Sequence, residues 1–293
     1  MMAKVKQSVN YQGGVAVNTE QIMQLALELA GLTEVPADSA VLVPGENIKR
    51  VLVGVDMGTA EMLLAKQLGC DCVIGHHPVG GPARAAFSQV MQRQIERMME
   101  AGIPINQAQK ALAKKVGQVE RSGHAGNYDQ AWSAARLLNL PLVSIHTPTD
   151  ILAERAVQQH LDQALAGNQY AKLHDIVDAL MELPEYQKTL SGPVIRVGSK
   201  DDYAGKHFVL MAGGTNGGVD VLKAYYAAGV GTTVAMHMPE DVITAIKEQN
   251  IGNVVVAGHM ASDSIGINQL LRALEERGVE VLRMSGVIDP SNS

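Results

Sequence analysis

The chain alternates short runs of β-branched residues with longer amphipathic stretches, and this alternation restricts its possible folds more than any other feature. Two strand-like runs, Arg50–Asp56 (RVLVGVD) and Cys70–Gly75 (CDCVIG), flank Thr59–Leu68, whose apolar spacing predicts a helix closed by Gly69. A strand–helix–strand unit of this kind pairs its strands in parallel. The pattern therefore predicts an α/β fold.

The same rhythm continues to the end of the chain. Asn18 and Gln21 have the spacing of a helix cap, so a helix is expected after Asn18 that ends at Gly31. Further strands are predicted at Leu142–Ile145, Val194–Val197, Phe208–Met211, Thr232–Ala235, Val254–Ala257 and Val279–Met284, and further helices at Ala108–Val116, Tyr128–Leu138, Ile151–Ala166 and Leu173–Leu183. The stretch 85–139 contains no predicted strand, which indicates a helical insertion. We expect a first α/β domain over 1–150, including this insertion, and a second over 151–293.

Composition excludes several functional classes. The 293 residues carry 24 basic and 30 acidic side chains without a Lys/Arg cluster, which argues against nucleic acid as the main partner. One Trp, seven Tyr and two Phe are too few for a base-stacking surface. No apolar run is long enough to span a bilayer, and the start, MMAKVKQSVNYQGG, lacks the hydrophobic stretch of a signal peptide.

The two cysteines, Cys70 and Cys72, are one residue apart. On a strand this spacing points both side chains to one face, but it is poorly suited to an unstrained disulfide. With no other cysteine in the chain, the sequence predicts a reduced, cytoplasmic protein.

Histidines follow the ends of several predicted strands. His76 and His77 come directly after CDCVIG, and His146 comes directly after PLVSI. His259 comes directly after NVVVAG, and His237 lies two residues after TTVA. Open α/β sheets bind their ligands beyond the carboxyl ends of the strands, so these positions favour a binding site.

Carboxylates accompany these histidines. Asp56 ends the first predicted strand, Asp150 follows His146 by four positions, and Asp263 follows His259 by four. If a helix begins at the histidine, residues i and i+4 share one face, so imidazole and carboxylate can bind one ion. Mixed ligation of this kind suits zinc, iron or manganese. The alternative is a helix-cap carboxylate beside a surface histidine.

His76 and His77 leave two arrangements open. Adjacent residues on an extended chain point in opposite directions, so each ring can serve a different ion of a pair. A turn at this point, for which Pro78 and the Gly80–Gly81 pair are suited, would bring both rings to one ion.

The glycine-rich stretch Ala212–Gly218 (AGGTNGG) lies between a predicted strand and a predicted helix. Backbone N–H groups at such a position can hold a phosphate, although the loop lacks the lysine of a P-loop. A simple tight turn is an equal alternative.

Three signatures together resemble the NGG-interacting-factor-three-like family, a dinuclear-metal family often named type-two GTP cyclohydrolase I. The run RVLVGVDMGTAEMLLAKQLGCDCVIGHHPVGG is similar to its first signature, PLVSIHTPTD to its middle one and AGHMASDSIGINQLLRAL to its last. The resemblance covers most of the chain in order and spacing. It implies two similar, intertwined three-layer α/β/α domains and a ring-shaped homohexamer with metal sites facing an internal cavity.

The resemblance also implies a set of site residues. Five residues would hold two divalent metal ions, namely His76, His77, Asp150, His259 and Asp263. Asp150 would bridge the ions, with Asp263 shared or nearby, and His146 would lie close to the metals and assist proton transfer. Two features depart from the family pattern: Asp263 stands where the family has Glu, and the N-terminal W-D-N-x-G-L motif is not evident.

The helical insertion supplies a rival pair of ligands. His77 and His146 are 69 positions apart, much more than is usual in the family. Within this interval the run HAGNYD places His124 five positions before Asp129. We prefer Asp150, because a predicted strand leads directly into it.

The sequence supports one main functional hypothesis and two alternatives. The main hypothesis is a metal-dependent hydrolase of a small substrate, such as a nucleotide, in which two ions activate water and His146 moves protons. The first alternative is a non-catalytic, oligomeric metal-binding scaffold or regulatory protein. The second is an α/β protein whose histidines bind no metal.

Overall fold

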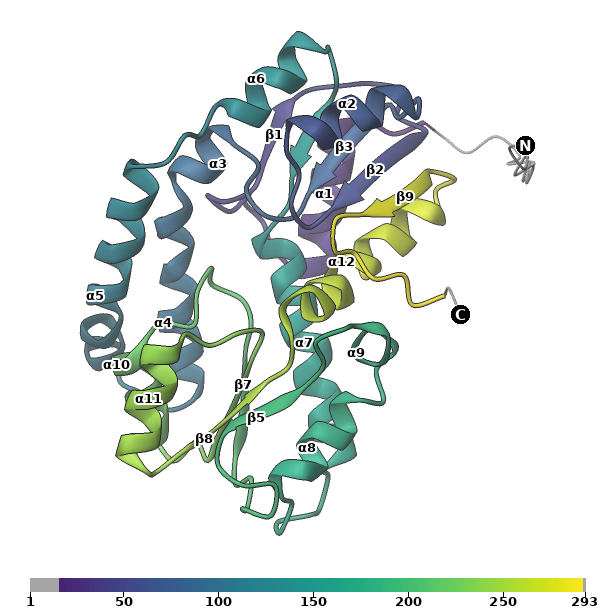
Figure 1. The fold of residues 1–293 in the computed structure, drawn as a ribbon. Coiled ribbons are helices and arrows are strands. Elements are labelled where there is room, and N and C mark those ends of the chain that lie inside the picture. The colour runs from purple at the N-terminus through teal and green to yellow at the C-terminus, as the bar shows by residue number, and fades with distance from the viewer. Residues whose placement is uncertain (1–15, 292–293) are drawn as a thin grey trace.

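The computed structural model describes residues 16–291 and contains two mainly parallel sheets (Figure 1). The N-terminal stretch in which the sequence shows no signal peptide lies outside the described residues. The first sheet has the strand order β1-β4-β3-β2-β9 and the second β5-β8-β7-β6. The strands are β1 (Ala40–Val43), β2 (Arg50–Gly54), β3 (Cys72–Gly75), β4 (Leu142–Ser144), β5 (Val194–Val197), β6 (His207–Leu210), β7 (Thr232–Ala235), β8 (Asn253–Val256) and β9 (Glu280–Met284).

The two halves of the chain repeat one topology. The order β1-β4-β3-β2 corresponds to β5-β8-β7-β6, and in both sheets only the edge strand β1 or β5 runs antiparallel to its neighbour. After the second sheet the chain returns, and β9 pairs in parallel with β2 of the first. The halves are therefore similar and intertwined. We propose that the two domains divide at residue 150. In this division, β9 belongs to the second half of the chain but pairs within the first sheet.

Helices cover both faces of each sheet. They are α1 (Thr19–Ala30), α2 (Thr59–Gln67), α3 (Gly81–Ala85), α4 (Gln92–Glu100), α5 (Ile105–His124), α6 (Gln130–Leu137), α7 (Thr147–Ala164), α8 (Leu173–Leu180), α9 (Pro184–Lys188), α10 (Val219–Ala227), α11 (Glu240–Gln249) and α12 (His259–Glu275), with a 3₁₀ turn η1 at Phe87–Met91. Helices α1 and α12 pack on one face of the first sheet, and α2 and α6 pack on the other. Helices α4, α5, α10 and α11 cover one face of the second sheet, and α7, α8, α9 and α12 cover the other. The predicted α/β/α fold is confirmed. None of the helices in the described part is both long and apolar enough to cross a membrane.

The helix starts follow from local sequence. Asn18 accepts a hydrogen bond from the backbone N–H of Gln21, whose side chain in turn accepts one from the backbone of Asn18, and Gly31 ends α1 in the left-handed conformation. Helix α7 begins at Thr147, four residues before the predicted start, because Pro148 is well tolerated in a first turn. The earlier start places Asp150 in the first turn of α7.

The predicted insertion 85–139 consists of η1 and helices α4 to α6 and contains no strand. Helix α5 is longer than the predicted Ala108–Val116 and continues through Gly117 to His124. It packs against α4 and α10, so tertiary contacts extend the helix beyond its apolar repeat. Helices α4 and α5 of the insertion therefore lie against the second sheet, whereas α6 packs on the first.

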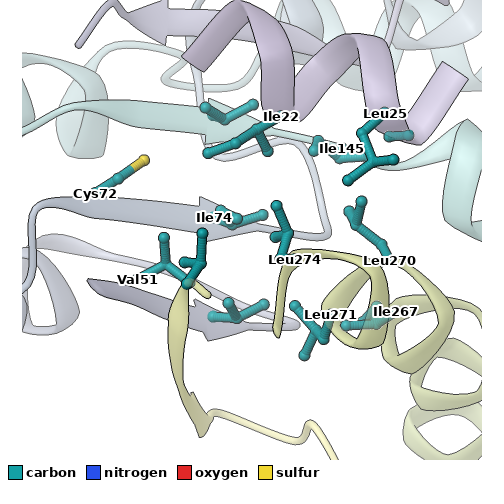
Figure 2. Packing of buried hydrophobic residues seen from close by; sticks show 14 of the residues in the cluster. Ile22, Leu25, Val51, Cys72, Ile74, Ile145, Ile267, Leu270, Leu271 and Leu274 are labelled. Carbon is teal, nitrogen blue, oxygen red and sulfur yellow. The ribbon is translucent and has the colours of Figure 1, made fainter. Parts of the chain in front are cut away.

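The largest hydrophobic cluster holds α1 and α12 on the first sheet (Figure 2). Ile22 of α1 and Leu274 of α12 face Val51 and Ile74 of the central strands. Because these side chains are almost fully buried, each contributes about 1.5–3 kcal/mol of transfer free energy. This packing fixes the start of α12 relative to the strand ends.

The expectation that the two cysteines share one face of a strand is wrong. Cys72 lies in the cluster beneath α1, whereas Cys70 belongs to the cluster on the opposite side of the sheet, with Met62 and Leu140. The reason is that β3 begins at Cys72, so Cys70 is outside the strand and does not follow its alternation. Both are free, buried thiols.

The stability of the protein should decrease above pH 9 in part through Cys72. Complete burial raises the pKa of its thiol above the ordinary value of 9.0, so at that pH the unfolded chain loses a proton that the folded chain keeps. The free energy of unfolding then falls with rising pH, by about 1.4 kcal/mol per pH unit for this group. Urea unfolding between pH 9 and 10 should give a steeper loss for the wild type than for Cys72→Ala. Parallel losses would contradict the assignment.

Candidate metal centre

Three strand ends supply the histidines of the candidate metal centre. Strand β3 leads into His76 and His77, β4 leads into His146 at the start of α7, and β8 leads into His259 at the start of α12. The chain bends directly after β3, so the rings of His76 and His77 lie together, with centroids 5.1 Å apart. The bend brings both rings to Asp263, where His76 Nε2 faces Oδ1 and His77 Nε2 faces Oδ2.

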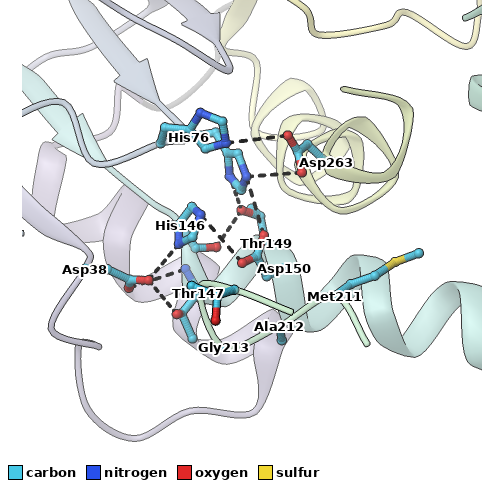
Figure 3. A network of polar contacts seen from close by, with 12 residues as sticks. Asp38, His76, His146, Thr147, Thr149, Asp150, Met211, Ala212, Gly213 and Asp263 are labelled. Atoms are coloured by element: carbon cyan, nitrogen blue, oxygen red, sulfur yellow. Dashed lines mark hydrogen bonds and ion pairs between the residues drawn. The ribbon is translucent and has the colours of Figure 1, made fainter. Parts of the chain in front are cut away.

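Helix α7 contributes Asp150 from its first turn, α12 contributes Asp263 one turn after His259, and the two helices pack against each other. His76 Nε2 is 3.4 Å from Asp150 Oδ1 and 3.5 Å from Asp263 Oδ1 (Figure 3). Asp263 Oδ2 lies 3.8 Å from His77 Nε2 and 3.5 Å from His259 Nε2. Asp263 therefore faces three histidines, although its side chain is one methylene shorter than the Glu that is usual in the family.

The predicted ligands form compact groups. Within residues 16–291, three sets of side chains have ligand atoms that all lie within 4.8 Å of one another, namely His76–His77–His146, His77–His259–Asp263 and His76–Asp150–Asp263. Each predicted site residue belongs to at least one set. The rival pair belongs to none of them: His124 is exposed at the end of α5, and Asp129 forms an ion pair with Arg136 at 2.8 Å.

The ring of His76 is held from its far side. His76 Nδ1 lies 3.0 Å from Thr149 Oγ1 and 3.3 Å from the carbonyl oxygen of Ile145. These contacts direct Nε2 toward the two acids. A partner on the second ring nitrogen is what a metal-binding imidazole usually has, because it sets both tautomer and orientation.

His77 and His146 are oriented in the same way by carboxylates. His77 Nδ1 is 2.8 Å from Asp56 Oδ1, and His146 Nδ1 is 2.7 Å from the buried Asp38 Oδ2. Thr147 also donates its hydroxyl hydrogen to Asp38. In each case Nε2 is left to face the cluster.

Asp38 is a site residue that the sequence analysis missed. Only Ser39 separates it from the edge strand β1, which was not predicted either, and its partner His146 is 108 positions away. Spacing cannot relate residues so far apart. The antiparallel pairing of β1 with β4 brings Asp38 beside His146.

Burial and mutual charge shift the protonation of the cluster. Burial, together with the charge of neighbouring His76, lowers the pKa of His77 to about 4. Burial raises the pKa of Asp150 to about 7. Burial opposes protonation of His146, but the carboxylates of Asp150 and Asp38 outweigh it and raise its pKa. Asp150 therefore needs positive charge close by to stay ionised, whereas, against the effect of burial, the surrounding histidines already lower the pKa of Asp263.

Four buried atoms of the cluster indicate which kind of ion these side chains can bind. His76 Nε2, Asp150 Oδ1 and both carboxylate oxygens of Asp263 are buried and have no hydrogen-bond partner in the described part of the chain. Buried polar atoms without partners are rare and costly. Because imidazole nitrogens and carboxylate oxygens are donors for zinc, iron and manganese, these residues fit a divalent cation.

A cavity of about 160 Å³ adjoins the cluster. Besides His146 and Asp263, it is lined by Phe87 of the insertion, by His237 and by the glycine loop around Gly214. The His237 and His259 rings have centroids 4.7 Å apart. Sequence analysis noted that His237 follows a predicted strand but did not assign it to the site. In the structure His237 follows β7, just as His77 follows β3, the equivalent strand of the first sheet.

Comparison with solved structures identifies the family. The crystal structure of a NIF3 superfamily protein from Sphaerobacter thermophilus is similar to this chain, with 41% sequence identity over 92% of this chain and 99% of that chain and a TM-score of 0.90. The chain belongs to the NIF3 superfamily. The resemblance of the three sequence signatures to the NGG-interacting-factor-three-like family is thus confirmed.

More distant NIF3-like folds are also similar to this chain. Reduced HcgD from Methanocaldococcus jannaschii has 14% identity over 92% of this chain and 99% of its own, with a TM-score of 0.58. A Bacillus cereus protein related to NIF3 has 12% identity over 92% and 97%, with a TM-score of 0.53. At these identities the likeness shows the fold alone. No family model and no curated protein matches the sequence.

Proposed function

We propose that this NIF3 superfamily protein is a dinuclear-metal-dependent hydrolase of a small substrate, such as a nucleotide. One observation carries the proposal: buried imidazole and carboxylate atoms without hydrogen-bond partners in the described chain converge beside an open cavity. A purely structural cluster would satisfy these atoms internally. The cavity favours catalysis over a scaffold that only stores metal, because it gives a substrate access to the cluster.

The distances suggest how the ligands divide between two ions. His76 and Asp150 would hold one ion, and His77 and His259 would hold the other. Asp263 belongs to both groups, which favours this acid as the shared ligand, whereas the family resemblance assigns the bridge to Asp150. Zinc, iron or manganese held there would supply Lewis acidity toward a substrate oxygen and toward water.

His146 is suited to move protons in this reaction. Its side chain lines the cavity, and its Nε2 lies 3.7 Å from Asp150 Oδ2. Asp38 holds Nδ1 at 2.7 Å and so fixes both the tautomer and the ring plane. Asp38 would thus be a positioning residue, and His146 would donate a proton to the leaving group.

The cavity limits how much of a substrate can enter, and the family resemblance bears on the oligomeric state. A cavity of about 160 Å³ admits the reacting end of a substrate, while the rest of a nucleotide would project from its mouth. The family resemblance implies a ring-shaped homohexamer, and the two free cysteines favour a reduced, cytoplasmic location. Analytical ultracentrifugation tests the hexamer directly.

Turnover by metal-loaded protein tests the proposed activity. On a panel of nucleotides and phosphate esters, His146→Gln should lower kcat by about 10²–10⁴-fold with the metal content unchanged, because it removes the proton donor. His124→Gln, which changes the exposed histidine of the insertion, is the matched control and should keep full activity. Full metal content without turnover of any panel member would contradict the hydrolase and leave the metal-binding scaffold.

A further inference from the structure

The glycine loop Ala212–Gly218 lies beside the metal centre. It follows β6, opens α10, and lines the cavity through Gly214, Thr215 and Asn216. Figure 3 shows the start of the loop passing close to the acids of the site. Sequence analysis left two equal alternatives for this loop, a phosphate-binding loop and a simple tight turn.

The start of the loop is tied to the same helix that carries Asp150. One turn further along α7, the buried carboxylate of Glu154 accepts hydrogen bonds from the N–H groups of Met211 and Ala212, both at 3.0 Å. Arg97 of the insertion pairs with the other oxygen of Glu154 at 3.0 Å. The loop therefore keeps a set position relative to the metal ligands.

The centre of the loop offers donors without acceptors. At its end, the N–H groups of Gly217 and Gly218 donate to the side chains of Thr215 and Asn216. Between these and the start, the N–H groups of residues 213–216 meet no acceptor in the part of the chain that is described. A simple tight turn would use some of these groups internally.

Asn216 adds a side-chain donor. The residue is only 7% exposed and lines the cavity. Its Oδ1 accepts from Gly218, but its amide nitrogen has no hydrogen-bond partner among residues 16–291. An amide donor that faces the cavity, next to a row of N–H groups without acceptors, suits a ligand rich in acceptor oxygens.

A lysine of the insertion lies beside the end of the loop. The stem of Lys115 on α5 packs on the loop, since a Cβ on Gly218 would lie 3.8 Å from Lys115 Cδ. No acid of the described chain lies within ion-pairing distance of Lys115, so its charge is available to a ligand.

The insertion also holds the loop in shape. Gln94 of α4 donates from Nε2 to the carbonyl oxygens of Gly213 and Thr215, at 2.8 Å each. The ring of Phe87 closes on Gly214, where a Cβ would lie 2.9 Å from the ring. Because these contacts already fix the loop conformation, little conformational entropy is lost when a ligand binds.

We propose that the loop 212–218 and Lys115 form a subsite for the phosphate group of the substrate, next to the metal centre. The protein's substrates would then be phosphate esters, with the phosphate on the loop and the reacting group facing His146. The catalytic use of the subsite rests on the proposed hydrolase function. Phosphate binding itself does not require turnover and can be measured separately.

Calorimetric titration of the metal-loaded protein with inorganic phosphate tests the subsite. Lys115→Gln should weaken phosphate binding by about 10-fold or more, because it removes a charge-assisted contact. Lys115→Arg keeps the charge and should restore binding. Lys114→Gln changes the exposed neighbour on the same helix and should leave the affinity as in the wild type.

Two results would overturn the subsite. One is a phosphate affinity equal in the wild type and Lys115→Gln. The other is phosphate binding that disappears on metal removal and does not respond to Lys115, which would place the anion on the metal. Neither result concerns turnover, so the hydrolase proposal is judged independently by the activity of the His146 and His124 variants.

Discussion

Asp263→Asn is expected to remove both divalent cations from the protein. Asp263 faces His76, His77 and His259 within 3.8 Å, so it belongs to both proposed ion sites. Asparagine keeps the shape but removes the negative charge, and the affinity for both ions should fall by about 100-fold or more. Elemental analysis after dialysis, together with calorimetric metal titration, measures this loss.

Variants of the unshared ligands provide the controls. Asp150→Asn should weaken only the ion held with His76, and His259→Ala only the ion held with His77. Asp129→Asn, in the ion pair of the insertion, should leave the metal content unchanged. If Asp263→Asn retained both ions, or Asp150→Asn lost both, Asp263 would not be the shared ligand.

Gly266→Ala is expected to destabilise the fold strongly. Helix α12 crosses α7 at Gly266, where a Cβ would lie 2.0 Å from the carbonyl oxygen of Thr149 and 3.0 Å from the backbone nitrogen of Ala153. The helices would have to separate, at a cost of about 3 kcal/mol that exceeds the gain in helix propensity of about 1 kcal/mol. Urea unfolding measures the change. Because the two helices carry Asp150 and Asp263, metal affinity should fall as well.

The same substitution elsewhere gives a matched control. Gly123 lies in α5, and a Cβ there would meet no atom within 4 Å. Gly123→Ala should therefore raise the free energy of unfolding by up to about 1 kcal/mol. A Gly266→Ala protein as stable as the wild type would show that the close crossing of α7 and α12 is not required.

Local patterns predicted most of the secondary structure. The predicted strands Val194–Val197 and Thr232–Ala235 coincide with β5 and β7, and the capping pattern of α1 is confirmed. Hydrophobic periodicity and caps act over a few residues, so a sequence shows them directly. The H-x-x-x-D spacing likewise reflects a single helical turn in α7 and α12.

Features that depend on distant packing could not be read in this way. The edge strand β1 is held by its pairing with β4, and α5 extends beyond its apolar repeat because it packs on α4 and α10. Asp38 and Lys115 carry no motif. Each gained its proposed role from a neighbour far along the chain, His146 for the first and the glycine loop for the second.

The sequence by itself determined the α/β class, the histidines and acids at the strand ends, and the family. It did so because each of these is encoded by residues a few positions apart. Only the tertiary structure decided that Asp263 lies among three histidines, that Asp38 orients His146, and that the insertion braces the glycine loop. These contacts depend on the crossing of α7 and α12, on the pairing of β1 with β4 and on the packing of α4 against the second sheet, which no local pattern records.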